Sequence, residues 1–246
     1  MHAYPRFIIA WFLLVGFSPL GGWVFTGQLA GNRQRTQHTD EATFDIQFGA
    51  IKRKTHQNTS WDKARFESCG QKFVDVSERR YGVALLNDCK YGHSVRNGEI
   101  GLSLIKSGIY PNPDADKETH EFKFSLFPHE GDLSDSDTLA NSYFVNQDLL
   151  EIEGKAPERK FSFVSSDCKN VVIETVKRSE DGSGVVIRVY ESENALTKFN
   201  LTFSKAFRTA FLTNLLEEDA LEVAQNSDVL SLEIKPYEVL TIKIEE

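Results

Sequence analysis

Short runs of apolar residues, or of alternating apolar and polar residues, recur from Phe44 to Ile244 and constrain the fold more than any other feature. About a dozen such runs follow one another at short intervals, a pattern typical of proteins built from large antiparallel sheets. The run from His120 to Phe127 alternates most clearly, and Asp181-Gly-Ser-Gly184 predicts a hairpin turn between two later runs. The chain is therefore expected to be mainly all-β, a large β-sandwich or supersandwich.

Only one stretch has the features of a good helix. Residues 133–150 are expected to form it, because Ser134 or Ser136 suits an N-terminal cap and two aspartates lie nearby. Residues 52–62 carry polar loop-forming side chains and are expected to form a loop that ends at Trp61. The fold prediction thus contains one short helix.

Charge and cysteine content limit the possible partners and compartment. The 246 residues have a net charge of −8, and no stripe of lysine and arginine suited to phosphate binding occurs, so no nucleic-acid partner is expected. Cys69, Cys89 and Cys168 are odd in number and widely spaced, which argues against both a disulfide framework and a zinc site. A reducing compartment, the cytoplasm, is the simplest location.

The N-terminal segment disagrees with a cytoplasmic location. An apolar run, 8–17, follows Arg6 and precedes glycine, proline and small residues, as in a signal peptide. Residues 6–25 are nearly long enough to anchor the chain in a membrane, and they also suit a hydrophobic strand and turn. Residues 1–40 are left unassigned, as a signal, an anchor or a misassigned start, whereas residues 41–246 are treated as one layered unit.

No catalytic motif is recognisable in the chain, and the six histidines are scattered. Several carboxylates lie near aromatic residues, but the sequence does not show the separation that a glycosidase pair requires. These carboxylates are Asp62, Glu67, Asp75, Asp88, Glu121 and Glu191. From the residues alone, the prediction is a soluble β-sandwich.

The stretch from Tyr81 to His93 joins a predicted buried strand, 82–86, to a polar loop. A polar loop held by a rigid strand is a common way to present a binding surface. The same residue types are also common in an ordinary β-turn without a binding role. Both interpretations remain open from the residues.

Three long motifs stand out in the chain: Asp45-Ile-Gln-Phe-Gly-Ala-Ile-Lys-Arg-Lys-Thr-His-Gln-Asn-Thr-Ser-Trp-Asp62, Tyr81-Gly-Val-Ala-Leu-Leu-Asn-Asp-Cys-Lys-Tyr-Gly92 and Pro236-Tyr-Glu-Val-Leu-Thr-Ile-Lys-Ile244. Through them the chain resembles the C-terminal region of glycoside hydrolase family 38 α-mannosidases, closest to the cytosolic type. The resemblance covers roughly residues 43–246. It implies the large C-terminal β-sandwich of that family, which is similar to galactose-mutarotase-like domains.

The resemblance also implies an activity that needs more than these residues. Family members hydrolyse terminal α-linked mannose from oligosaccharides by a retaining, metal-dependent mechanism, with zinc or cobalt implied as the divalent metal. Their metal ligands and nucleophile lie in a catalytic barrel that precedes the sandwich, together with a helical domain. Those motifs are not found here, so we expect no catalytic residue, no metal ligand and no cofactor in this chain, and no activity from it alone. The chain looks like a truncated product, a partial gene or a gene model with a replaced start.

The expected partners are a mannose-containing oligosaccharide and the missing barrel and helical domain, or a complementary fragment. The alternative is a non-catalytic carbohydrate-binding or interaction module, secreted through the apolar N-terminal segment. By position in the family, the resemblance implies substrate contacts from seven residues: Asp88, Tyr91, Asn87, Lys90, Arg65, Glu67 and Lys106. Asp88 is expected to bind a hydroxyl and Tyr91 to stack on a sugar face, although each residue is also suited to hold a turn or an interdomain contact.

Overall fold

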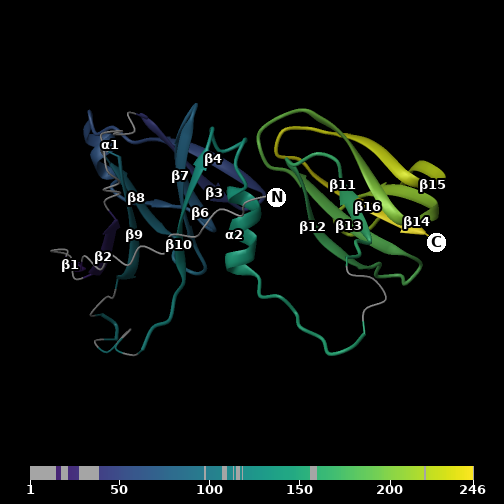
Figure 1. Ribbon diagram of the computed structural model, residues 1–246, viewed down its shortest axis with the longest axis horizontal. Helices are drawn as coiled ribbons and strands as arrows, with labels where there is room; N and C mark the ends of the chain where they lie inside the picture. The colour runs from purple at the N-terminus through teal and green to yellow at the C-terminus, as the bar shows by residue number, and fades with distance from the viewer. Residues whose placement is uncertain are drawn as a thin grey trace. The chain divides into compact units, whose positions relative to one another are not determined.

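The computed structural model describes residues 15–17, 22–27, 39–96, 98–106, 110–112, 114, 117, 119–155, 160–218 and 220–245. The chain divides into two compact units (Figure 1). The first comprises Met1–Gln47 and Ile51–Leu149, and the second comprises Phe48–Ala50 and Leu150–Glu246. Residues 41–246, predicted to form one layered unit because the β pattern continues along them, contribute to both of these units.

The first unit contains two five-stranded sheets, and every strand pair identified in them is antiparallel. One sheet has the order β1 (Val15–Phe17), β2 (Gly22–Gly27), β9 (Glu99–Lys106), β8 (Gly92–Arg96) and β5 (Ser68–Cys69). The other has the order β10 (Phe124–Glu130), β7 (Tyr81–Asn87), β6 (Phe73–Glu78), β3 (Glu41–Ile46) and β4 (Gly49–Lys54).

A hydrophobic core lies between these two sheets. Val74 and Leu85 of one sheet belong to the same buried cluster as Ile100 and Leu102 of the other, and each is nearly or fully inaccessible to solvent. Burial of such side chains is the main favourable contribution to folding. The first unit is therefore a β-sandwich, as the sequence predicts.

Helix α2 (Thr138–Asn146) covers the outer face of the second sheet (Figure 1). Leu139 and Val145 of the helix pack against Phe73, Ala84 and Leu86 of the sheet. The helix is shorter than the predicted 133–150. It begins later because the hydroxyl of Ser136 accepts a hydrogen bond from the Thr138 backbone and residues 133–136 form a turn.

A second helix, α1 (Ser60–Ala64), corrects the prediction of one helix and of a loop up to Trp61. Thr59 caps it: its hydroxyl accepts from the Asp62 backbone N–H, and the Asp62 side chain accepts from the Thr59 backbone. These reciprocal hydrogen bonds form a capping box, which stabilises the short helix.

The second unit contains one six-stranded sheet. Its order is β11 (Val164–Ser166), β14 (Thr197–Thr213), β16 (Val239–Glu245), β13 (Val185–Glu191) and β12 (Val171–Arg178), with β15 (Leu221–Ile234) paired to β14. The predicted hairpin at Asp181–Gly184 connects β12 and β13.

Strand β14 replaces two predicted strands, and its pairing with β15 is interrupted between Thr202 and Phe207. Phe203, within this irregularity, and Phe207, at its end, contact each other edge to face, with 5.3 Å between ring centroids. Residues from both halves of β14 share one core cluster with Ile187 and Ile242, so the sheet encloses a core of its own. Together the two units confirm the mainly β-sandwich fold class.

Part of the apolar N-terminal segment lies in a sheet. Residues 15–17 pair with 23–25 in β2, and β2 pairs with β9. Residues 6–14 and 18–21 lie outside the described residues, so the signal or anchor stays a prediction. Among the helices of the described residues, none is long and apolar enough to cross a membrane.

Gly82 in β7 allows the close approach of a buried ion pair. Asp75 is fully buried, and its Oδ2 lies 2.8 Å from Nε2 of His129. Burial alone would lower the pKa of His129, but the hydrogen bond to Asp75 and its negative charge raise that pKa overall. A Cβ atom at Gly82 would lie 2.2 Å from the His129 ring, so only glycine fits beside the pair.

We expect Gly82→Ala to lower the free energy of unfolding by about 1–3 kcal/mol, because the new methyl group displaces His129 from Asp75. Gly154→Ala is the matched control, since a Cβ there meets nothing within 4 Å. Urea unfolding of the full chain measures both variants. Equal stability of the two would show that the His129 ring is not closely packed against Gly82.

Candidate functional site: the Asn87 loop and the adjoining arginine hollow

Asn87 ends strand β7, and its fully buried side chain holds the loop that follows. Its Nδ2 donates to the Gln71 carbonyl at 2.9 Å, and its Oδ1 accepts from the Lys90 backbone N–H at 2.7 Å. The Asn87 carbonyl accepts from the side chain of Asn146 in α2 at 2.8 Å. This position suits the alternative that Asn87 holds a turn; a substrate contact from it stays a prediction.

Asp88, Lys90 and Tyr91 lie on the loop that Asn87 anchors. Asp88 Oδ1 is buried and has no hydrogen-bond partner among the described residues. Burial acts to raise the pKa of Asp88, but hydrogen bonds from Cys89 and Lys123 lower it overall, which favours the carboxylate. Tyr91 is 54% exposed, and the Lys90 ammonium lies 5.4 Å from the centroid of the Phe122 ring.

Glu67 directly precedes β5, and His93 lies on β8, the strand that pairs with β5. Ser68 of β5 pairs with His93 of β8, and Glu67 accepts a hydrogen bond from the hydroxyl of Ser103. The His93 ring is fully buried, with Nε2 3.4 Å from the Asn87 amide and Nδ1 3.3 Å from the Tyr91 carbonyl. Burial lowers the pKa of His93 to about 4, and the Tyr91 carbonyl and the charge of Glu67 offset only part of that effect. His93 is therefore neutral at physiological pH.

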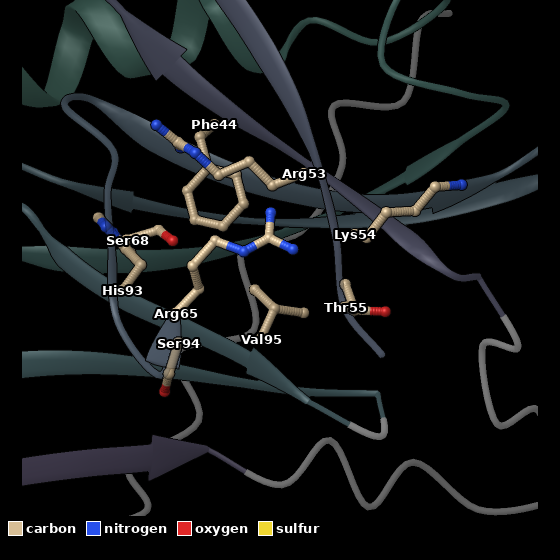
Figure 2. Close-up of a pocket in the computed structure, with 9 residues that line it drawn as sticks. All are labelled: Phe44, Arg53, Lys54, Thr55, Arg65, Ser68, His93, Ser94 and Val95. Atoms are coloured by element: carbon tan, nitrogen blue, oxygen red, sulfur yellow. The ribbon is translucent and has the colours of Figure 1, made fainter. Parts of the chain in front are cut away.

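Arg65 lies in a hollow on the other side of His93. Figure 2 shows its guanidinium extending toward the space beside Phe44 and Val95. The hollow is lined by Phe44, Arg53, Lys54, Thr55, Arg65, Ser68, His93, Ser94 and Val95. Its volume is about 20 Å³, which holds about one water molecule and is too small for a sugar ring.

The structure thus brings six of the seven predicted residues to neighbouring positions around β5, β8 and the loop after β7. For Lys106 only the backbone is described, at the end of β9 opposite Gly22. Sequence reasoning missed Arg53 and His93, because only the pairing of strands distant in the chain brings them beside Arg65.

Three other carboxylates singled out in the sequence, Asp62, Asp75 and Glu191, have structural partners. Asp62 accepts from Thr59 and Arg65, and the hydrogen bonds from Thr59 lower its pKa to about 2. Buried Glu191 accepts from the Asn170 side chain and from the backbone of Tyr237. Within the described ranges, no group of three or more His, Cys, Asp and Glu side chains is arranged to hold a metal ion. These residues therefore do not fit the implied divalent metal, and we assign no ligand to it.

Comparison with known proteins shows the relationship of the chain. Residues 34–114 match the glycosyl hydrolases family 38 C-terminal domain, and residues 170–242 match the glycosyl hydrolases family 38 C-terminal beta sandwich domain. The chain belongs to glycosyl hydrolase family 38, as a C-terminal region. It is 39% identical over 214 residues to Alpha-mannosidase G of Dictyostelium discoideum, and 38% identical over 211 residues to Alpha-mannosidase 2C1 of Homo sapiens.

These alignments cover 82% and 83% of the chain but only 19% and 20% of the two relatives. The chain thus spans about a fifth of the length of the curated α-mannosidases it matches. Among solved structures, an α-mannosidase from Enterococcus faecalis V583 is similar in fold, with a TM-score of 0.65 and 21% identity over 84% of this chain and 24% of that one. The family 38 resemblance and the C-terminal sandwich fold are confirmed.

We expect His93 to titrate near pH 4 in the folded chain, against about 6.5 for an unperturbed histidine. Since the unfolded chain binds this proton more readily, His93 contributes a loss of stability of roughly 3 kcal/mol as the pH falls from 6.5 to 4. The NMR titration of its Cε1–H, assigned with His93→Gln, measures the midpoint. A midpoint near 6.5 would mean that the ring is not buried against Asn87 and Phe44.

Proposed function

We propose that this chain is the C-terminal β-sandwich region of an α-mannosidase that hydrolyses terminal α-linked mannose from oligosaccharides. The observation that supports it most strongly is the identity of 38–39% to two α-mannosidases across more than four-fifths of the chain. Similarity at this level extends through both units, so it includes the Asn87 loop as well as the framework.

Within this proposal, the loop after β7 forms part of the wall of the mannose site. Asp88 supports this role, because its Oδ1 is a buried acceptor with no partner in the described part of the chain. A buried carboxylate oxygen without a donor is costly, so a donor from the substrate or from another part of the enzyme is expected to complete it. Exposed Tyr91, three residues further along, offers an aromatic face for stacking on a sugar.

The chemical step is proposed to lie outside these residues. A retaining glycosidase requires two carboxyl groups about 5–5.5 Å apart, one as nucleophile and one as acid and base. The buried carboxylates Asp62, Asp75 and Glu191 are instead engaged by Arg65, His129 and Asn170. The divalent metal, zinc or cobalt, is likewise proposed for the full-length enzyme, and the cytoplasm is the proposed location.

A non-catalytic carbohydrate-binding or interaction module is the second candidate function. It is favoured by Trp61 and Tyr91, which are 82% and 54% exposed and available for stacking or docking. If the chain is such a module, it binds mannose-containing oligosaccharide by itself. If it forms part of the wall of the mannose site, as in the first proposal, it binds the oligosaccharide only together with the rest of the enzyme.

A chimaera tests the first proposal. We expect human Alpha-mannosidase 2C1, with its matching C-terminal region replaced by residues 34–245, to hydrolyse a chromogenic α-mannoside. Asp88→Ala in this chimaera should lower kcat/KM by about tenfold or more, because a hydrogen bond to a charged group contributes about 1.5–3 kcal/mol. Asp114→Ala is the matched control, since the Asp114 side chain is 75% exposed and pairs with Lys117 at the surface.

Two results would contradict the proposal. One is a folded chimaera without activity, and the other is an equal effect of Asp88→Ala and Asp114→Ala. Circular dichroism and gel filtration establish folding in each case.

A further inference from the structure

The arginine hollow lies where the edges of the two sheets of the first unit meet. Its lining includes residues of β4 and β5, which in the described part of the chain are the last strands of the two sheets, and of their neighbours β3 and β8. The side chains of Arg53 and Arg65 both line it (Figure 2). Such a concentration of positive charge is unusual in a chain whose net charge is −8.

Arg53 is held in place without a carboxylate partner among the described residues. Its NH1 donates to the Cys69 carbonyl at 2.7 Å, and its guanidinium carbon lies 4.5 Å from the centroid of the Phe44 ring. Burial, and to a smaller extent the positive charge of Arg65, lower the pKa of Arg53. A guanidinium remains charged nonetheless, so the hollow contains an uncompensated positive charge.

Arg65 and Lys54 differ in where their charged groups lie relative to the hollow. Arg65 shares the Asp62 carboxylate with His56, at 2.7 Å and 3.3 Å, and its side chain remains half exposed. The Lys54 ammonium is paired with Asp40 at 2.9 Å and Glu41 at 3.0 Å, and Figure 2 shows it directed away from the hollow. Arg53 therefore supplies a positive charge without a carboxylate partner among the described residues, and Arg65 brings its guanidinium into the hollow while paired with Asp62. Lys54 contributes no charge to the hollow.

The remaining lining of the hollow suits an anion as well. Ser68 contributes a hydroxyl group that can donate, and His93, Phe44 and Val95 contribute uncharged surface, whereas Figure 2 shows the Ser94 hydroxyl directed away from the hollow. The volume of about 20 Å³ accommodates one or two oxygens of an anion, with the rest of the molecule in solvent.

We propose that this hollow is an oxyanion-binding site, in which Arg53 and Arg65 bind a phosphate or carboxylate group. The planar guanidinium fork matches two oxygens of such a group, and charge-assisted hydrogen bonds of this kind are about twice as strong as neutral ones. The occupant accepts hydrogen bonds from these two side chains and offsets the repulsion between their like charges. This site is separate from the mannose contact proposed for Asp88 and does not rest on it.

NMR titration of the full chain with inorganic phosphate, and separately with acetate, tests the proposal. Sodium chloride at equal ionic strength is the reference. We expect saturable shifts of the Arg53 Nε–H and of the Ser68 and Ser94 amides, with a Kd of about 1–10 mM for at least one of the two anions.

Three variants assign the binding to the guanidinium groups. Arg65→Gln should weaken binding at least about tenfold, and so should Arg53→Lys, which keeps the charge and the stem but removes the fork. Lys54→Gln should change the Kd less than about twofold, because that ammonium is already paired at the surface. The dispersion of the amide spectrum shows that each variant is folded.

Binding of phosphate alone or of acetate alone supports the site and identifies the class of its occupant. The proposal is overturned if neither anion gives shifts beyond those of chloride. It is also overturned if Lys54→Gln weakens binding as much as Arg65→Gln, since the effect is then general surface charge.

Discussion

The buried amide of Asn87 is the interaction on which the rest of the first unit depends. Its two polar atoms join the end of β7 to Gln71 and Lys90, and its Nδ2 lies beside His93. The backbone carbonyl of Asn87 accepts a hydrogen bond from the side chain of Asn146 in α2. Every one of these groups would cost about 1–3 kcal/mol if buried without a partner, so the loop has little freedom to change shape. The side chain of Asn87, which is inaccessible to solvent, thereby fixes the positions of Asp88 and Tyr91 on the loop.

The same arrangement explains how a sandwich can serve an enzyme without supplying its chemistry. The core between the sheets provides rigidity, the loop after β7 provides a positioned surface, and the sheet edges provide sites for further contacts. At one such edge, Arg53 covers Phe44 with its guanidinium, which closes the core and at the same time leaves a positive charge facing outward. Arg53 thus takes part both in covering the core and in the proposed binding surface. Such a double role is consistent with similarity to α-mannosidases that extends over most of the chain.

The sequence predicted the β-sandwich because strand alternation and turn residues are local signals, and the order and position of most strands follow from them. Helix α1 was missed because five residues show no periodicity, although the Thr59 and Asp62 pair is a recognisable capping pattern. The two compact units were not separated, since the β pattern does not change across the connection. The pairing of β5 with β8 is a long-range contact that no local pattern encodes, and it alone brings His93 toward Arg65. Likewise, the sequence placed Asn87 in a polar loop but did not reveal that its amide is directed inward.

The central claim is that this region presents and supports a mannose site whose reacting groups lie elsewhere. The most direct measurement is hydrolysis of a chromogenic α-mannoside by the purified 246-residue chain, with and without added zinc or cobalt. The account predicts no turnover above the rate of the uncatalysed reaction under either condition. Metal-dependent turnover that survives repurification would contradict it, and Asp62, Glu67 and Asp88 would then be the first carboxylates to replace.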